Sequence, residues 1–208
     1  MDTLERELKQ RGFDFVIGVD EAGRGPLAGP VVAAAVALKQ NNIHTTIKDS
    51  KQLSASQREK AFHQIYDNAY IGVGIISESV IDQANILNAT FFAMTNAIVE
   101  LISRLPVSTP TASRLHPNVC LLIDGNQFRC DLPYRYRTIV KGDEKVLSIA
   151  CASIIAKVTR DRILGVYHRI FPQYHFDQHK GYPTLDHKMA IQRFGPSLIH
   201  RKTFHYQL

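Results

Sequence analysis

The sequence predicts an α/β fold with a mixed sheet, and three features of the chain lead to this expectation. Apolar segments of strand length cluster near the N-terminus and then alternate with helical segments. Turns rich in glycine and proline separate these segments. The chain has 208 residues, of which 45% are hydrophobic, and that is enough to bury a sizeable core. We therefore expect a single domain over residues 1–208.

The first elements are expected before residue 40. Residues 3–11 have the pattern of a short amphipathic helix, and Gly12 suits its C-cap. Residues 15–20 are apolar and β-branched, which is typical of a buried strand. Three glycines and two prolines make residues 22–30 a loop. Residues 31–38 are apolar throughout and predict a second strand joined to the first by that loop.

The middle of the chain predicts a polar turn, a helix, a strand and two further helices. Their expected ranges are 49–54, 54–68, 69–76, 79–88 and 89–105. Ser54 and Ser79 are the expected N-caps of the first two helices, because a serine hydroxyl accepts a hydrogen bond from a free amide of the first turn.

The last third predicts a proline-rich surface loop, two strands and two helices. Their expected ranges are 106–117, 119–123, 136–140, 147–171 and 185–194. Pro172 ends the long helix, in which apolar residues recur at helical spacing.

Four acidic residues stand at points where the chain changes direction. Asp20 and Glu21 end the first predicted strand, Asp124 ends the fourth, and Asp143 follows a glycine just before the long helix. Enzymes with α/β folds place their chemistry at such strand ends. If the strands before Asp20 and Asp124 are parallel neighbours, both carboxylates emerge at one edge of the sheet. Converging carboxylates repel one another unless they hold divalent cations. Asp143 alone also suits a polar turn or an N-cap.

The charge of the chain is basic, with a formal net charge of +6 and an isoelectric point of about 9.3. Such a charge serves solubility or attracts phosphates. From Lys157 to the end, nine Lys and Arg stand against three Asp. Lys157 and Arg160 lie either on a solvated face of the long helix or against a duplex backbone, and Lys48 and Lys51 are candidates for further phosphate contacts.

The cysteines and the N-terminus suggest a cytoplasmic, soluble protein with no membrane contact. Three cysteines without a C-x-x-C spacing suit a reducing compartment, and the charged N-terminus lacks an apolar signal core. His175 and His179 are four residues apart, but Pro172 and Gly181 disfavour a regular helix between them. We therefore expect ordinary polar histidines there rather than a transition-metal site.

Several motifs together resemble one family. Residues 18–32 read GVDEAGRGPLAGPVV and closely resemble the start of the type 2 ribonucleases H, specifically the bacterial ribonuclease HII family. Further segments agree in the same order: KDSKQLS (48–54), NILNAT (85–90), IDG (123–125), KGD (141–143), ASIIAKVTRD (152–161) and HKGYPT (179–184). The resemblance covers residues 14 to 200.

The resemblance implies an endonuclease that hydrolyses the RNA strand of RNA–DNA hybrids. It also implies incision on the 5′ side of single ribonucleotides in duplex DNA, which leaves a 3′-hydroxyl and a 5′-phosphate and serves removal of ribonucleotides and RNA primers. The implied fold is a ribonuclease H-like mixed five-stranded sheet flanked by helices. The implied domain is a single catalytic one over residues 1–208, with a helical substrate-binding extension over about 172–208.

The resemblance also implies roles for individual residues. Two Mn²⁺ or Mg²⁺ ions would be bound by the four acids Asp20, Glu21, Asp124 and Asp143. The loop Gly23-Arg24-Gly25 would read the ribose 2′-hydroxyl, the group that distinguishes RNA from DNA. Tyr182 would help to recognise the RNA–DNA junction. From the residues alone, Tyr182 also suits a half-buried position at the start of the last helix.

Two other functions remain open at this point. A resolvase or a ribonuclease HIII shares the fold, although the motif series argues against the first and the short segment before the first strand argues against the second. A nucleic-acid-binding protein without catalysis is the other alternative, which four acids near a phosphate disfavour unless metal is present. We expect a monomer.

Overall fold

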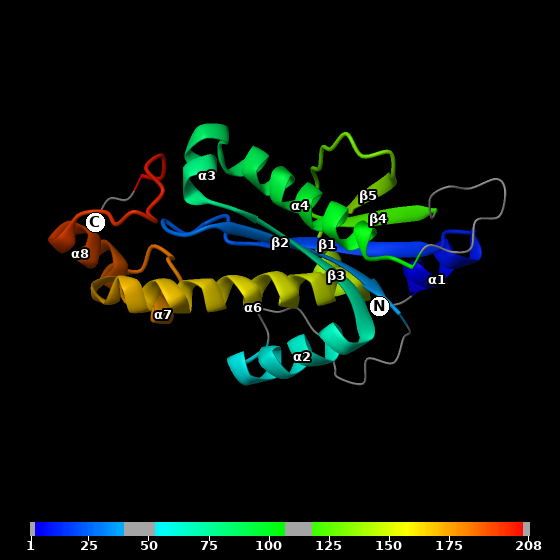
Figure 1. Ribbon diagram of the computed structural model, residues 1–208, viewed down its shortest axis with the longest axis horizontal. Helices are drawn as coiled ribbons and strands as arrows, with labels where there is room; N and C mark the ends of the chain where they lie inside the picture. The colour runs from blue at the N-terminus through cyan, green and yellow to red at the C-terminus, as the bar shows by residue number, and fades with distance from the viewer. Residues whose placement is uncertain (1–2, 40–52, 107–117, 206–208) are drawn as a thin grey trace.

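The computed structural model describes residues 3–39, 53–106 and 118–205, and a five-stranded sheet forms its centre. The strands are β1 (Phe15–Ala22), β2 (Val31–Leu38), β3 (Ala69–Ile76), β4 (Val119–Asp124) and β5 (Arg135–Ile139). They lie in the order β3-β2-β1-β4-β5 (Figure 1). β1 pairs antiparallel with β2 and parallel with β4, β3 pairs antiparallel with β2, and β5 pairs parallel with β4. The predicted mixed sheet is confirmed.

Helices cover both faces of this sheet. They are α1 (Thr3–Gln10), α2 (Ala55–Asn68), α3 (Glu78–Ala84), α4 (Ile86–Ser103), α5 (Gly142–Lys145), α6 (Leu147–Ile170), α7 (Phe176–His179) and α8 (Leu185–Phe194), with a 3₁₀ turn η1 (Pro172–Tyr174) before α7. α4 lies along one face and α6 with α2 along the other (Figure 1). The sheet is therefore the middle layer of three.

The alternation of side chains along the strands divides the core between the two faces. Ala33 and Ala35 of β2 belong to the cluster beneath α4, whereas Ala34 and Val36 belong to the cluster beneath α2 and α6. At Gly74 of β3 an added Cβ would lie 1.9 Å from a backbone oxygen of α4, so only glycine permits this close approach.

One helix of the described chain, α4, is long and apolar enough to cross a membrane. In the structure, however, it is a core helix, because its buried residues pack against β2 and β3. Its composition therefore follows from its place under the sheet.

Several predicted boundaries need correction. β1 continues past Asp20, because Asp20 and Glu21 pair with β2 at Ala34 and Ala33. The helix expected from Ser79 instead follows Ser77 and ends at Ala84. The break between α3 and α4 falls at Asn85 and not near residue 88.

A residue with a positive φ explains that break. Asn85 has φ of 67°, and its side chain accepts a hydrogen bond of 3.1 Å from the amide of Asn88, which caps α4. Asparagine is a strong N-cap, because its side-chain oxygen satisfies a free amide of the first turn. Ser54 caps α2 as predicted, with Gln57 completing a reciprocal capping box. The turn expected over 49–52 and the loop expected over 107–117 lie outside the described residues.

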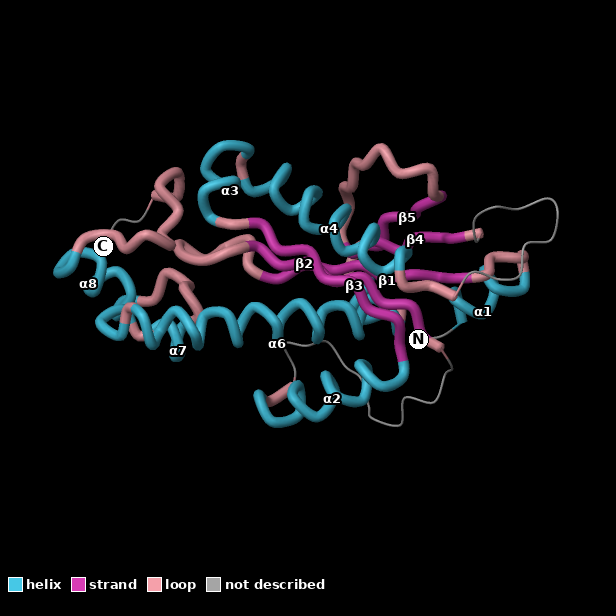
Figure 2. Tube along the Cα trace, viewed as in Figure 1, coloured by secondary structure: helices cyan, strands magenta, loops and turns pink. Residues whose placement is uncertain are grey.

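The C-terminal segment packs around the end of α6 that lies away from α1 (Figure 1). Its small core contains Leu164 of α6 together with Phe176, Ile191 and Ile199. The loop between β1 and β2 extends to this region (Figure 2). Backbone hydrogen bonds of 2.8 Å join Leu27 to Gly181 and Gly29 to Ile199. The loop after β1 is thus held by the C-terminal part.

Candidate active site

The four predicted acids line one cavity. The parallel register of β1 and β4 pairs Val19 with Ile123, so Asp20 and Asp124 follow at the same edge of the sheet, as predicted. The cavity has a volume of about 280 Å³. Its lining consists of Asp20, Glu21, Ala22, Gly23, Arg24, Gly25, Arg58, Asp124, Asp143, Ser153, Lys157 and Tyr182.

Asp143 reaches the cavity through a direct link between α5 and β4. The carboxylate oxygen Oδ1 of Asp124 accepts a hydrogen bond of 2.7 Å from the backbone amide of Gly142. Lys141 has a left-handed conformation with φ of 55°, which turns the chain from β5 into α5. The buried side chain of Asp143 is therefore brought beside the end of β4 by local geometry that no helix or strand pattern predicts.

Burial and mutual repulsion govern the charge of these acids. Asp20 is only 6% exposed, and burial, followed by the charges of Glu21 and Asp124, raises its pKa well above the ordinary value. A hydrogen bond of 2.7 Å from the amide of Glu21 opposes that rise in part. For Glu21, burial and the charge of Asp124 raise the pKa, whereas its ion pair with Arg24 at 3.3 Å acts in the opposite direction. The cluster therefore has a tendency to take up a proton or a cation.

The donor set fits hard divalent cations. All four groups offer carboxylate oxygens, the ligands that Mg²⁺ and Mn²⁺ prefer, without thiolate or imidazole among them. In the described residues, no three acidic, histidine or cysteine side chains are already arranged to hold an ion. Two of the acids are instead engaged with the protein, Asp124 with Gly142 and Glu21 with Arg24. A carboxylate has further lone pairs beside the one used in such a contact, so both groups can still bind a cation.

The two glycines of the predicted loop differ in their surroundings. Gly23 has φ of 101°, and an added Cβ would lie 2.2 Å from Nε of Arg160 and 2.8 Å from the oxygen of Pro30. At Gly25 an added Cβ would meet only Cε1 of Tyr182, at 3.8 Å. Gly23 is thus required by packing, whereas the exposed Gly25 leaves space between the loop and Tyr182.

Tyr182 is held at the mouth of the cavity by a tight turn. Lys180 and Gly181 both have left-handed conformations, with φ of 52° and 82°, and they reverse the chain after α7. Tyr182 remains 41% exposed, and Nζ of Lys157 lies 5.9 Å from the centroid of its ring. The structure thus brings Tyr182 and Gly25 together from positions far apart in the sequence.

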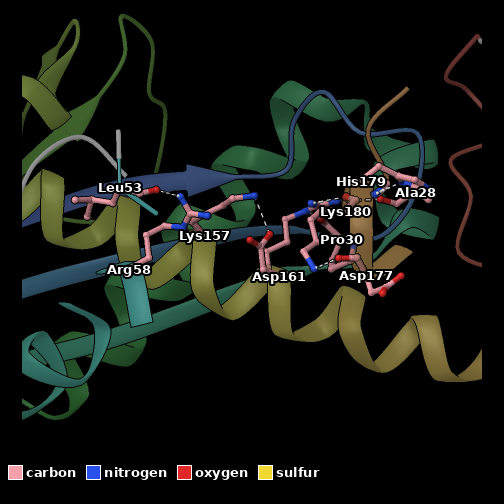
Figure 3. A network of polar contacts seen from close by, with 11 residues as sticks. Ala28, Pro30, Leu53, Arg58, Lys157, Asp161, Asp177, His179 and Lys180 are labelled. Carbon is pink, nitrogen blue, oxygen red and sulfur yellow. Dashed lines mark hydrogen bonds and ion pairs between the residues drawn. The ribbon is translucent and has the colours of Figure 1, made fainter. Parts of the chain in front are cut away.

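The expectation that Arg160 is solvated or touches a duplex backbone is wrong. Its side chain is 1% exposed and donates hydrogen bonds of 2.9 to 3.0 Å to the carbonyl oxygens of Ala28, Pro30 and Lys180. Burial lowers its pKa to about 10. These three partners lie together beside α6 (Figure 3). Arg160 therefore joins the loop after β1 to the turn that carries Tyr182.

A second buried arginine, Arg201, was not identified from the sequence. It is 1% exposed, and its guanidinium donates hydrogen bonds to the carbonyl oxygens of Gly23, Arg24 and Gly29 at 2.5 to 3.0 Å. Burial, and then the charge of Arg160, lowers its pKa to about 9. Its partners are backbone groups, which leave no trace in a sequence pattern.

The basic residues of the cavity are Arg24, Arg58 and Lys157. Lys157 lines the cavity and pairs with Asp161 at 2.8 Å (Figure 3). Arg58 of α2 is a further cation of the cavity that no sequence motif marks, and it donates a hydrogen bond of 2.5 Å to the oxygen of Leu53. Lys48 and Lys51 lie outside the described residues.

Comparison with known proteins gives matches over most of the chain. The family model described as Ribonuclease HII matches residues 17–207. A ribonuclease HII from Syntrophus aciditrophicus is 52% identical over 205 residues, which cover 98% of this chain and 90% of that protein. A ribonuclease HII from Chlamydia pneumoniae is 45% identical over 206 residues, which cover 98% of this chain and 89% of that protein.

Solved structures share the same architecture. The ribonuclease H2 from Pyrococcus horikoshii OT3 has a TM-score of 0.67 at 28% identity and covers 91% of this chain and 93% of that chain. A structure of the PCNA:RNase HII complex from Archaeoglobus fulgidus has a TM-score of 0.71 at 23% identity. The match covers 93% of this chain and 96% of that chain. Bst-RNase HIII in complex with Mn²⁺ has a TM-score of 0.68 at 19% identity, with 94% and 68% covered, and at that identity it shares the fold alone.

Proposed function

The chain belongs to the ribonuclease HII family, and from this we propose that it is a metal-dependent endonuclease that hydrolyses the RNA strand of RNA–DNA hybrids. We extend the proposal to incision on the 5′ side of a single ribonucleotide in duplex DNA, with a 3′-hydroxyl and a 5′-phosphate as products. Removal of misincorporated ribonucleotides and of RNA primers in the cytoplasm is the role that suits this chemistry.

One observation supports the proposal more than any other. A single cavity of about 280 Å³ combines the four acids with Gly25 and Tyr182. Carboxylates alone would repel a phosphodiester, and a glycine loop alone would not hydrolyse one. Together they provide a place for the reacting phosphate next to groups that can contact the sugar beside it.

The four acids are the proposed ligands of two divalent ions, Mn²⁺ or Mg²⁺. Asp20 and Asp124, which follow paired positions of β1 and β4, would hold or bridge the ions, and Glu21 and Asp143 would complete the ligand sets. Such ions, when bound, supply activation of water near neutral pH and stabilisation of the leaving oxygen. Burial and neighbouring carboxylates, which raise the pKa of Asp20, disfavour an uncompensated negative charge there, and a bound cation would compensate it.

The glycine loop and Tyr182 would provide the discrimination between RNA and DNA. The backbone at Gly23 and Gly25 carries no side chain, so a ribose 2′-hydroxyl can approach it closely. The exposed ring of Tyr182 can stack on the sugar or donate its hydroxyl proton to a phosphate. Gly25 would then define the gap that the sugar must fill.

The remaining contacts follow from the positions of the basic groups. Arg24 and Lys157 line the cavity and are proposed to contact phosphates. Lys48 and Lys51, which lie outside the described residues, are proposed to do the same. Residues 172–208 are proposed to act as a substrate-binding extension of one catalytic domain. The protein is proposed to act as a monomer.

A labelled DNA duplex with one ribonucleotide tests the proposal. With Mn²⁺ or Mg²⁺ we expect a single nick on the 5′ side of the ribonucleotide, and none with chelator. Cleavage of a continuous hybrid without that nick would retain the nuclease and remove the junction specificity. Salt-sensitive binding without cleavage of either duplex would leave only a nucleic-acid-binding protein.

A further inference from the structure

Three histidines of the C-terminal segment form a buried cluster that the proposed chemistry does not use. His187 is fully buried and His200 is 3% exposed, and the rings of His179 and His187 stack with centroids 4.3 Å apart. Phe176 contacts all three rings, with centroids 5.5 to 6.0 Å away. Burial of a polar ring costs free energy unless its nitrogens are hydrogen-bonded, so the presence of imidazoles here calls for a reason.

The hydrogen bonds of the cluster form one chain with a single consistent direction. The backbone amide of Ser197 donates to Nδ1 of His200 at 2.8 Å, so that nitrogen carries a lone pair. Nε2 of His200 then bears the proton and donates to Nε2 of His187 at 3.0 Å. Nδ1 of His187 is left to donate to the carbonyl oxygen of Tyr182 at 2.9 Å. Both imidazoles are neutral in this arrangement, and every ring nitrogen has a partner.

This chain of hydrogen bonds ends at Tyr182, which lines the cavity. The carbonyl oxygen of Tyr182 also accepts a hydrogen bond of 2.8 Å from the amide of Thr184, the N-cap of α8. The amide of Tyr182 donates to the oxygen of His179 at 2.9 Å. Both backbone groups of Tyr182 are therefore fixed by the cluster and by the start of α8.

We propose that His187 and His200 are positioning residues for Tyr182: their directed hydrogen-bond chain holds the Tyr182 backbone so that its ring stays opposite Gly25. The consequence for substrate choice rests on the proposed function, whereas the positioning itself does not. Desolvation supports neutral rings, since burial lowers the pKa of both histidines to about 4.

A matched pair of substitutions separates this role from packing. His187→Asn places an amide nitrogen near the position of Nδ1 and retains a donor toward Tyr182, whereas His187→Gln places its amide near Nε2 and retains only the contact with His200. Both variants lose the ring and its stacking on His179. Hydrogen exchange at the amide of Thr184, which donates to the oxygen of Tyr182, measures how firmly this segment is held, and it needs no nucleic acid. The ratio of nicking at a single ribonucleotide to cleavage of a continuous hybrid measures the effect on substrate choice.

We expect exchange at Thr184 to rise by about tenfold and the cleavage ratio to fall by about tenfold in His187→Gln, with His187→Asn within about threefold of the wild type. Equal exchange in the two variants would overturn the positioning role. Raised exchange with an unchanged cleavage ratio would overturn its consequence for substrate choice. If the wild type itself makes no nick at a ribonucleotide, the proposed junction specificity fails, and exchange alone still decides the positioning.

A measurement on the wild-type protein covers the case in which the variants do not fold. Two-bond ¹H–¹⁵N correlation spectra distinguish the two neutral forms of a histidine ring. We expect protonation at Nδ1 for His187 and at Nε2 for His200. The opposite form at His187 would remove the donor toward Tyr182 and overturn the proposal.

Discussion

Nη2 of Arg201 donates a hydrogen bond of 2.5 Å to the carbonyl oxygen of Gly23, although 178 positions separate the two residues in the chain. The same guanidinium also binds the oxygens of Arg24 and Gly29. The loop that faces the cavity is therefore supported from within by the C-terminal segment. This contact makes the shape of the loop depend on residues that do not line the cavity.

Arg201→Met should lower both stability and activity. The substitution leaves the oxygens of Gly23, Arg24 and Gly29 without their buried donor, and unsatisfied groups of this kind cost about 1–3 kcal/mol each. We expect the free energy of unfolding, measured in urea, to fall by at least about 2 kcal/mol. Arg193→Met, at an exposed position of α8, is the control and should leave stability nearly unchanged.

Gly23→Ala should lower stability, whereas Gly25→Ala should lower only activity. At Gly23 the new Cβ meets Arg160 at 2.2 Å and the backbone is left-handed, so we expect a loss of about 2–4 kcal/mol of stability. At Gly25 the contact with Tyr182 is an ordinary 3.8 Å, so stability should stay within about 0.5 kcal/mol. The methyl group nevertheless enters the gap proposed for the sugar, and nicking at a single ribonucleotide should fall. Normal nicking by a folded Gly25→Ala protein would count against that gap as the reading site.

Asp124→Asn should lower activity and raise stability. The amide oxygen of the new side chain can still accept the hydrogen bond from Gly142, but the side chain contributes no negative charge to the ligand set. We expect cleavage with Mg²⁺ or Mn²⁺ to fall by about 10²- to 10⁴-fold. Without metal, removal of one charge from the repelling cluster should raise the free energy of unfolding by about 1 kcal/mol. Full cleavage by this variant would exclude Asp124 as an essential ligand.

Local patterns predicted the parts of this site that depend on neighbouring residues. The strand end at Asp124 follows from an apolar run that ends in an acid, and the same pattern places Asp20 in β1, although that strand continues to Ala22. Their meeting depends on the parallel pairing of β1 with β4, which lie about a hundred residues apart in the chain. From the sequence, the meeting of Asp20 and Asp124 could be predicted only on the condition that their strands are parallel neighbours. The observed sheet order meets that condition.

The two buried arginines show where such prediction stops. Arg160 shares the polar side of α6 with Lys157 and Asp161, so helical spacing placed it in solvent. The turn around Lys180 covers that side and buries it. Arg201 binds carbonyl oxygens, which every residue possesses, so no pattern marks its partners. Both errors arise from tertiary contacts of the C-terminal segment.

The buried histidines should make the fold sensitive to acid. His187 and His200 have pKa values of about 4 in the folded protein because of burial, against about 6.5 in the unfolded chain. Above pH 6.5 both states are neutral, so their contribution to stability is complete. As the pH falls from 6.5 to 4 only the unfolded chain takes up protons, and each histidine removes up to about 1.4 kcal/mol per pH unit.

A double variant isolates this effect from the acids. The raised pKa of Asp20 acts in the opposite direction, since burial and neighbouring charges favour its protonated form in the fold. His187→Asn with His200→Gln retains Asp20 and removes both imidazoles. The free energy of unfolding, measured in urea between about pH 7.5 and 4.5, should therefore fall less toward acid pH in the double variant than in the wild type. An equal fall in the two proteins would mean that other groups govern the acid sensitivity.

Arg58→Ala should weaken binding of nucleic acid and reduce its salt dependence. Arg58 is a cation of the cavity that comes from α2 and not from the Gly23-Arg24-Gly25 loop, and a phosphate is the natural ligand for it. Loss of one phosphate contact lowers the slope of log K against log salt concentration by about 1. Lys60→Ala, at an exposed position of the same helix, retains the fold and changes the net charge equally. If both variants reduce the slope by the same amount, Arg58 acts through general charge. A reduction in Arg58→Ala alone identifies a specific contact with a phosphate of the bound nucleic acid.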